Sequence, residues 1–494
     1  MPPPFPLGVA LVVGAILAWD IVVASRGAQA PAAAPALRAL TALTGILLAP
    51  GLLVAVADGA LLTARLTQQL WWLWPATVAC ATLQAAWVAL RRPVAPAVAL
   101  PLAAWNGLLL VAAAARVLPE RGMDEPAWMG AVAAAVLHAC AAVAGPAALT
   151  SPFMVLPPVL APSLPSRWRP VAVVRAGVSA VAALASALVL SRLPGAVEAR
   201  RSYARYAVER LQERPSGDIA IGLRILPRID RAPSPYALRG DLALADSVQP
   251  RALLVRVAAA TPLAALDSLA RALEPLRRDS VQLVLEAAEG SARVDPRVLE
   301  RLARRLRPEF VVIEAEPPAR RGARGSDPLV RLEEAGRGVH AGYAGARVVV
   351  AIDPLMSDAR AWFTWARTRA AGVAVAGVVL RAGTGGAAEL DEQLAMVSQW
   401  IASQPSDRPV WVTRLATAPA AHGEEAQALA WRGLLAWAMR TPDVRGVLAG
   451  PASDYADVTG VRAASGRLRP VARVLAATAH GLREGRAATR ASPP

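Results

Sequence analysis

Charged residues stand where short apolar runs end in the second half of the chain. The residues in these places are Arg224, Arg228, Arg256, Glu286, Glu289, Glu314, Glu316, Asp353, Arg381, Arg414, Asp454 and Asp457. Carboxyl groups transfer protons or attack carbon, whereas guanidinium groups bind carboxylate or phosphate through paired hydrogen bonds. The pattern therefore predicts either acid–base chemistry or recognition of an anion, if the runs bring these side chains to one rim.

The apolar runs themselves predict eight β-strands. They are rich in valine and isoleucine and begin near Ile219, Leu253, Val281, Phe310, Val348, Val375, Val410 and Val444. Roughly 30 residues separate neighbouring runs, which suits one strand and one helix each. The stretches between them, such as PLAALDSLARALEPLRR, place leucines on one helical face. We expect residues 218–482 to form a (β/α)8 TIM barrel, with an open doubly wound sheet as the alternative because periodicity does not report closure.

Three segments resemble the clan A glycoside hydrolases. FVVIEAEPP, at the fourth strand, places Glu316 where that family has the glutamate of Asn-Glu-Pro. RPVWVTRLA, at the seventh strand, resembles the family's strand ending in Thr-Glu-x-Gly. Residues 446–475 resemble its last strand and the segment that ends in Lys-Pro, with Arg469 in the place of the lysine. The resemblance covers about residues 218–482, and it implies that Glu316 is a general acid/base.

The departures from the family's pattern imply that its reaction has been lost. Arg414 occupies the position of the family's nucleophilic glutamate. Retaining cleavage needs two carboxyl groups about 5 to 5.5 Å apart, and a guanidinium offers hydrogen-bond donors only. Ala315 replaces the asparagine before the acid/base, and Gly450 stands where an aromatic residue is expected. We therefore expect a glycosidase-like barrel, a pseudoenzyme that lacks the retaining nucleophile.

Three interpretations of the altered site remain open. In the first, Glu316 and Arg414 form an ion pair that closes the cleft. In the second, arginines form a cationic bowl that binds an anionic glycan or a phospholipid headgroup. Its residues are Arg414, Arg256, Arg224 and Arg381, together with Arg320, Arg321 and Arg324, and Asp353 and Asp454 share the rim. In the third, Glu316 retains hydrolysis with another acid, which is Glu286, Asp353 or Asp454.

The first 191 residues predict a transmembrane helical domain. Long apolar stretches occupy residues 5–24, 40–62, 70–90, 94–117, 127–149 and 171–191. Each has about the 20 residues that a helix needs to cross a bilayer. Arginines are more frequent in the loops that are cytoplasmic if the N-terminus is outside, so the rule that cytoplasmic loops are positive favours an extracytoplasmic C-terminal half. We expect a multi-pass protein of a bacterial inner membrane.

Polar residues interrupt these apolar stretches. They are Asp20, Asp58, Asn106, His138 and Arg175. Hydrogen bonds to neighbouring helices are the simplest expectation, and transport or a proton relay is the alternative, because charge is costly in lipid.

Composition excludes several other functions. All 53 basic residues are arginine, so neither a lysine Schiff base nor a Gly-Lys-Ser/Thr phosphate loop is present. The net charge is +16, but the sequence has no block of arginines interleaved with aromatic residues, so we expect no nucleic-acid partner. The four histidines lack metal-ligand spacing. We expect no metal and no cofactor.

These observations divide the chain into four regions: a transmembrane domain at 1–191, a charged helical connector at 192–217, the barrel at 218–482 and a disordered tail at 483–494. The first functional hypothesis is a membrane-anchored, extracytoplasmic barrel that binds or processes an anionic polysaccharide. The alternative is a non-catalytic accessory or scaffold subunit, whose partners are the lipid bilayer and other membrane proteins.

Overall fold

The computed structural model describes residues 7–483 with gaps. The gaps are residues 29–33, 57–71, 92–93, 145–156, 161–168, 216, 226–234, 279, 288–294, 316–327, 371, 384, 418, 455–458 and 464. The predicted residues Asp58, Arg228, Glu289, Glu316 and Asp457, and Arg320, Arg321 and Arg324, lie outside the described residues, as does the tail from 484.

The C-terminal part is a closed barrel of eight parallel strands, in sequence order around the ring. Its strands are β1 (Ala220–Ile225), β2 (Ala252–Val257), β3 (Gln282–Ala287), β4 (Phe310–Glu314), β5 (Arg347–Ile352), β6 (Val373–Ala382), β7 (Val410–Thr417) and β8 (Val444–Ala449). The pairing of β1 with β8 closes the ring. The predicted TIM barrel is confirmed, and the open doubly wound sheet is wrong.

Each strand contributes to two apolar cores, because successive side chains point to opposite faces. In β2, Leu253 and Val255 face the surrounding helices, whereas Ala252 and Leu254 belong to the barrel interior. Most of the interior is aliphatic, and Phe310 packs against Trp411 with 4.4 Å between ring centroids. The interior is therefore a filled core, and only the strand ends can hold a site.

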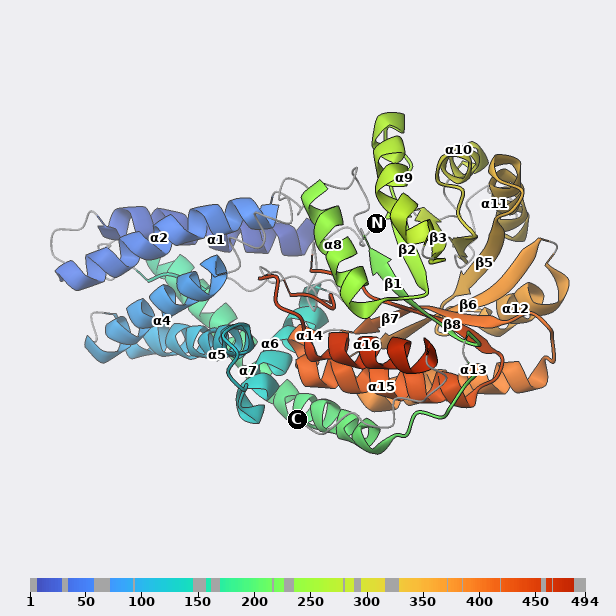
Figure 1. The fold of residues 1–494 in the computed structure, drawn as a ribbon. Coiled ribbons are helices and arrows are strands. Elements are labelled where there is room, and N and C mark those ends of the chain that lie inside the picture. The colour runs from blue at the N-terminus through green and yellow to red at the C-terminus, as the bar shows by residue number, and fades with distance from the viewer. Residues whose placement is uncertain are drawn as a thin grey trace.

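Helices surround the barrel (Figure 1). They are α8 (Pro235–Val248), α9 (Leu263–Arg278), α10 (Pro296–Leu306), α11 (Pro328–Gly342), α12 (Ala359–Thr364), α13 (Ala387–Ser403), α14 (Pro419–His422), α15 (Glu424–Arg440) and α16 (Pro470–Arg483). Helix α10 shows why the sequence folds this way: Asp295 caps its first turn by accepting a hydrogen bond from the Arg297 amide at 2.9 Å. Its leucines, at positions 299, 302 and 306, are buried against the barrel.

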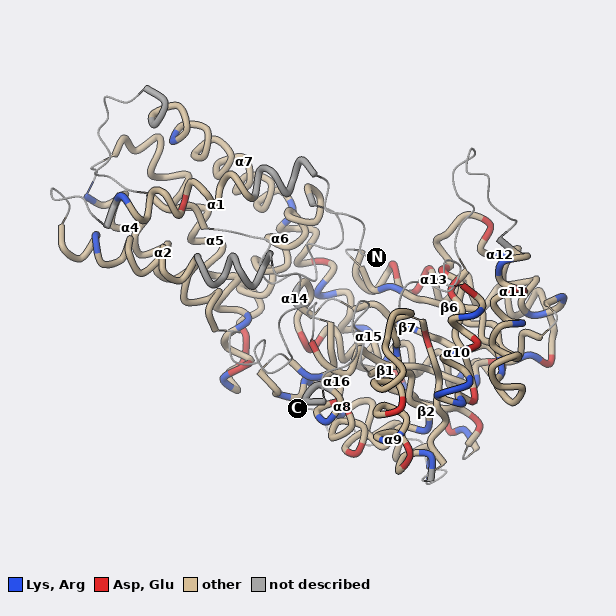
Figure 2. The backbone as a smooth tube through the Cα atoms, turned by 90° about the horizontal axis from the view of Figure 1, so that it is seen from above, with Lys and Arg blue, Asp and Glu red and all other residues tan. Residues whose placement is uncertain are grey.

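The N-terminal part is helical and lies beside the barrel (Figure 1). Its helices are α1 (Leu7–Ala28), α2 (Pro35–Val56), α4 (Leu73–Arg91), α5 (Pro96–Glu120), α6 (Ala127–Ala144) and α7 (Arg169–Ser202). Charged residues are sparse here and frequent on the barrel (Figure 2). Within the described residues, three helical stretches are long and apolar enough to cross a membrane: Leu73–Arg91, Pro96–Glu120 and Ala172–Val208. The full bundle of six spans remains a prediction.

The two parts are joined by a continuous element. Helix α7 leads into a 3-10 segment, Tyr203–Val208, and then into an extended stretch at residues 209–215. The Arg214 guanidinium in that stretch donates hydrogen bonds to backbone carbonyls of five residues between Ala438 and Val444. Tyr206 donates to Asp391 of α13 at 2.6 Å. The connector is thus packed against the barrel.

Candidate functional site

The last inward-facing position of nearly every strand is charged. The alternation that buries Leu254, Val312 and Leu448 inside the barrel continues to these positions. In strand order they hold Arg224, Arg256, Glu286, Glu314, Asp353, Arg381, Arg414 and Gly450. We call the seven charged residues the mouth ring. Seven of the predicted site residues or alternatives therefore do meet at one end of the barrel.

Arg414 belongs to this ring because of an irregularity in β7. The register between β6 and β7 shifts after Val378, so that Arg414 lies opposite Val379, an interior residue. The skipped residue, Thr413, donates its hydroxyl to the Val378 carbonyl at 3.1 Å. A β-bulge of this kind re-aims a side chain. Without it, Thr413 rather than Arg414 would face inward next to Val379.

Glu286 is the centre of the mouth ring. Its Oε2 accepts a hydrogen bond from the Arg224 guanidinium at 2.7 Å, and its Oε1 lies 3.3 Å from Arg256 Nε. Only 3% of the Glu286 side chain is exposed. Burial alone would raise the pKa of Glu286, but the charges of Arg224, Arg256 and Arg414 outweigh burial and lower it. Glu286 is therefore a carboxylate held by cations on several sides.

Arg414 forms an ion pair with the end of β4. Its guanidinium lies 3.7 Å from Glu314, the last residue of β4. Burial and the neighbouring charge of Arg224 lower the pKa of Arg414, against the carboxylates of Glu314 and Glu286, which raise it. About a third of the Arg414 side chain, 32%, is exposed. The expected ion pair between Arg414 and Glu316 stays a prediction, because Glu316 lies outside the described residues.

Arg381 and Asp353 form a fourth ion pair of the ring, at its more open side. Asp353 also accepts a hydrogen bond from the Leu355 amide at 3.0 Å. The backbone of Arg381 is fixed by Gln393, which accepts from its amide and donates to its carbonyl at 2.9 and 2.8 Å. Every acid of the mouth ring therefore has an arginine beside it.

Among the predicted binding residues that the structure describes, Asp454 is the one that does not belong to the mouth ring. It forms a bidentate, buried ion pair with Arg469, with N–O distances of 2.8 and 2.6 Å. It also accepts a hydrogen bond from the Gly460 amide. Burial would lower the pKa of Arg469, but Asp454 and Glu424 raise it. Asp454 thus fixes the loop after β8.

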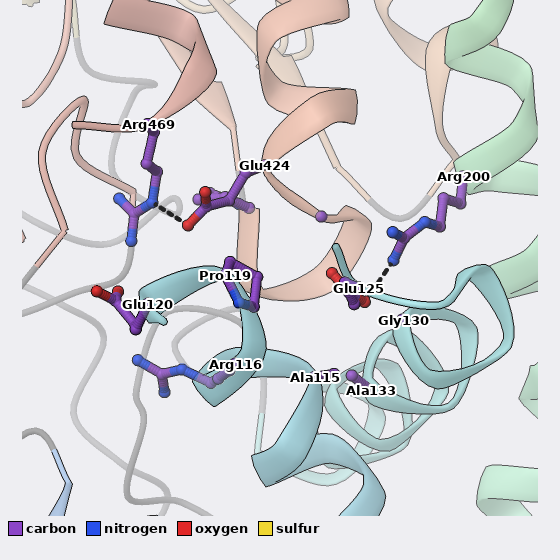
Figure 3. Close-up of a pocket in the computed structure, with 12 residues that line it drawn as sticks. Ala115, Arg116, Pro119, Glu120, Glu125, Gly130, Ala133, Arg200, Glu424 and Arg469 are labelled. Atoms are coloured by element: carbon purple, nitrogen blue, oxygen red, sulfur yellow. Dashed lines mark hydrogen bonds and ion pairs between the residues drawn. The ribbon is translucent and has the colours of Figure 1, made fainter. Parts of the chain in front are cut away.

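Arg469 leads to a second charged centre, at the junction between the helical part and the barrel (Figure 3). A cavity of about 40 Å³, room for roughly two waters, is lined there by charged residues of both parts. They are Arg116, Glu120, Glu125, Arg200, Glu424 and Arg469. Arg200 donates to Glu125 at 3.0 Å, and Arg469 to Glu424 at 3.1 Å. Sequence reasoning missed this centre, because its members come from segments hundreds of residues apart.

No protein-family model and no curated protein matches the chain. Solved structures do resemble it. A GH5_18 structure from Streptomyces cattleya in complex with Manb1-4GlcNAc is 15% identical, with a TM-score of 0.43, and the match covers 55% of this chain and 83% of that one. Beta-glucuronidase 2 of Bacteroides uniformis is 13% identical, with a TM-score of 0.39, over 54% and 37%. The beta-glucuronidase of Faecalibacterium prausnitzii is 10% identical, with a TM-score of 0.38, over 54% and 49%.

The chain therefore spans half or less of the length of both glucuronidases. At these identities and TM-scores the similarity carries no conclusion about activity, and the TIM-barrel fold rests on the closed ring of eight strands. Among the described residues, no group of three or more His, Cys, Asp and Glu side chains could hold a metal ion.

Proposed function

We propose that this chain is a membrane-anchored, non-catalytic subunit of a membrane protein complex, built on a glycosidase-like barrel without a retaining nucleophile. The observation that carries the proposal is the mouth ring, in which each of the three acids lies beside at least one arginine. The carboxylates of the ring form ion pairs at the strand ends, which is where TIM-barrel enzymes have their catalytic residues.

The chemistry of glycoside cleavage explains why this arrangement argues against turnover. The general acid must hold a proton at working pH, which requires a raised pKa. The pKa of Glu286 is lowered, so it fails as the acid. It also fails as a nucleophile, because it is buried and both of its oxygens face guanidinium groups. Arg414, at the position of the family's nucleophile, offers no lone pair.

The membrane part of the proposal rests on helix length and on arginine placement. Three described helical stretches are able to span a bilayer by length and composition. The arginine distribution in the loops favours an extracytoplasmic barrel at a bacterial inner membrane. The helical part and the barrel share an ion pair across their junction, Arg467 with Glu120 at 3.5 Å, so we propose that they act as one body.

A second candidate is binding of an anionic glycan at the mouth ring. The ring holds four arginines against three acids, which leaves one positive charge. Arg414 and Arg381 are its most exposed arginines, with 32% and 49% of their side chains accessible. Guanidinium groups of this kind could engage a carboxylate in bidentate fashion without dismantling the buried part of the ring.

Two measurements on the full chain in mild detergent test the first proposal. Purification from native membranes, followed by particle-mass measurement, should give a complex heavier than the 51.4 kDa chain, with a second protein at a fixed ratio. Aryl β-glycosides should not be turned over. A monodisperse monomer, or turnover that disappears in Glu314→Gln, would show that the proposal is wrong.

The glycan candidate is tested by comparing ligands that differ in charge. On an array at low salt, Arg414→Ala should weaken binding of acidic glycans more than binding of neutral ones. The matched control is Arg473→Ala, which changes an arginine of α16 outside the ring. Equal losses for acidic and neutral glycans, or no binding by the unaltered chain, would rule out this candidate.

A further inference from the structure

A short non-helical segment is buried inside the helical part. Residues 157–160 adopt no regular structure, yet all four are buried. Val159 and Leu160 expose only 1% and 3% of their surface. The helices around the segment, α1, α2, α4 and α5, pack against one another in that order. Backbone of this kind is tolerated at membrane depth only where protein groups or water satisfy its polar atoms.

Three fully buried polar side chains, from three different helices, satisfy this backbone. Asp20 of α1 accepts from the Val159 amide at 2.7 Å. Asn106 of α5 donates to the Pro158 carbonyl at 3.2 Å, so that it and Asp20 hold the two ends of one peptide group. Gln84 of α4 bonds both the amide and the carbonyl of Leu160. The segment is therefore clamped by residues that sequence analysis had noted only as polar interruptions, and by Gln84, which it had missed.

We call Asp20, Gln84 and Asn106 the clamp. It leaves one carboxylate oxygen, Asp20 Oδ2, without a hydrogen-bond partner among the described residues. Within the described part of the chain, Asp20 Oδ2 is buried and makes no hydrogen bond. The residue is 0% exposed and packs in an apolar cluster with Leu17, Val23 and Val159. No arginine pairs with it among the described residues. A carboxylate buried in this way is costly unless a positive charge neutralises it.

We propose that Asp20 binds a monovalent cation, either a proton or a sodium ion, next to residues 157–160. A carboxylate beside irregular backbone supplies oxygen ligands that a helix interior does not. A divalent ion would require more carboxylates, and no group of three acidic or imidazole side chains exists in the described chain. Cation binding neutralises Asp20 and thereby stabilises the docked segment. The helical part then does more than anchor the barrel.

The test is hydrogen exchange of the Val159 and Leu160 amides, measured on the full chain in lipid nanodiscs. One arm replaces choline chloride by sodium chloride at about pH 8. The other lowers the pH from about 8 to about 5 in choline chloride, with exchange corrected for its intrinsic pH dependence. When the cation that binds Asp20 is present at ten times its Kd, exchange of the two amides should slow about tenfold. A sodium effect alone identifies sodium, and a pH effect alone identifies the proton.

Asp20→Asn is the diagnostic variant, because it keeps the shape and removes the charge. Its Val159 and Leu160 amides should respond to neither arm, whereas Asp246→Asn, an exposed change in α8, should respond like the unaltered chain. If Asp20→Asn does not fold, the exchange map of the unaltered chain decides: peptides over 157–160 must respond and peptides over β3 must not. No response in either arm, or a full response in Asp20→Asn, would overturn the proposal.

Discussion

Two buried polar centres in this chain each hold a carboxylate, and they differ in whether an arginine neutralises it. At the barrel mouth, Glu286 is surrounded by the guanidinium groups of Arg224 and Arg256. In the helical part, Asp20 is as deeply buried but meets a backbone amide and no arginine among the described residues. The difference teaches that burial alone does not mark a functional site. Arginines of the chain itself neutralise Glu286, so this acid is not available for chemistry. Asp20 has no such arginine among the described residues, so we expect it to bind a cation.

The largest effect should come from breaking the neutralised centre. Glu286→Gln removes the countercharge of the buried Arg224 and a negative charge beside Arg256, so we expect the barrel to lose about 3 to 5 kcal/mol of its free energy of unfolding. Denaturant titration of the full chain in detergent measures this. The control is Asp353→Asn, which breaks the exposed pair with Arg381 and should cost at most about 1 kcal/mol. Equal losses for the two variants would contradict the central place of Glu286.

His422 of α14 is a further buried group, and its charge state depends on pH. Burial and the neighbouring His138 lower the pKa of His422 to about 4, and its Nε2 donates to the Gly383 carbonyl at 2.7 Å. The unfolded chain takes up this proton below about pH 6.5, before the folded chain does. The free energy of unfolding should therefore be constant above about pH 6.5 and fall by up to about 3 kcal/mol as the pH approaches 4.

His422→Gln should remove most of this pH dependence, because glutamine can still donate to Gly383 and does not titrate. Thermal unfolding of both proteins between about pH 7 and pH 4 measures the difference. Parallel pH profiles for the two proteins would show that His422 is not buried as a neutral group.

A smaller and local effect is expected from the clamp around residues 157–160. Gln84→Leu removes the partner of both polar groups of Leu160, and we expect a loss of about 1 to 3 kcal/mol in the local stability of the helical part. Hydrogen exchange should accelerate at Leu160 and stay unchanged in β3. Uniform acceleration across the chain would mean that the clamp supports the whole fold.

The smallest effect is expected from a single substitution that restores the carboxylate at the position of the family's nucleophile. Arg414→Glu returns a carboxylate to the seventh strand but places it beside Glu314 and leaves Ala315 and Gly450 unchanged. We expect no turnover of aryl glycosides above that of the unaltered chain. Brisk turnover would show that the cleft is otherwise intact.

The barrel could be predicted from the sequence because its signal is local. Valine- and isoleucine-rich runs recur at the spacing of strand and helix, and each predicted strand start lies within two residues of the observed one. The ring positions followed from the same periodicity. The ion pair of Arg414 with Glu314 did not, because it depends on the bulge at Thr413 and on how far β4 extends.

The two other polar centres left no comparable signal. Asp454 follows β8, like a rim residue, but its partner Arg469 comes from the start of α16. Asp20, Gln84 and Asn106 lie on separate helices and meet only through the backbone of residues 157–160. Contacts of this kind depend on tertiary packing, which periodicity in one segment does not encode.

The most direct test of the closed mouth is covalent trapping of a nucleophile. We predict that the full chain, incubated with cyclophellitol-6-carboxylate aziridine and with neutral cyclophellitol aziridines, keeps its unmodified mass in intact-protein mass spectrometry. A stoichiometric adduct on Glu286, Glu314 or Asp353 would contradict the account, because it would show that an acid of the mouth ring is free to attack.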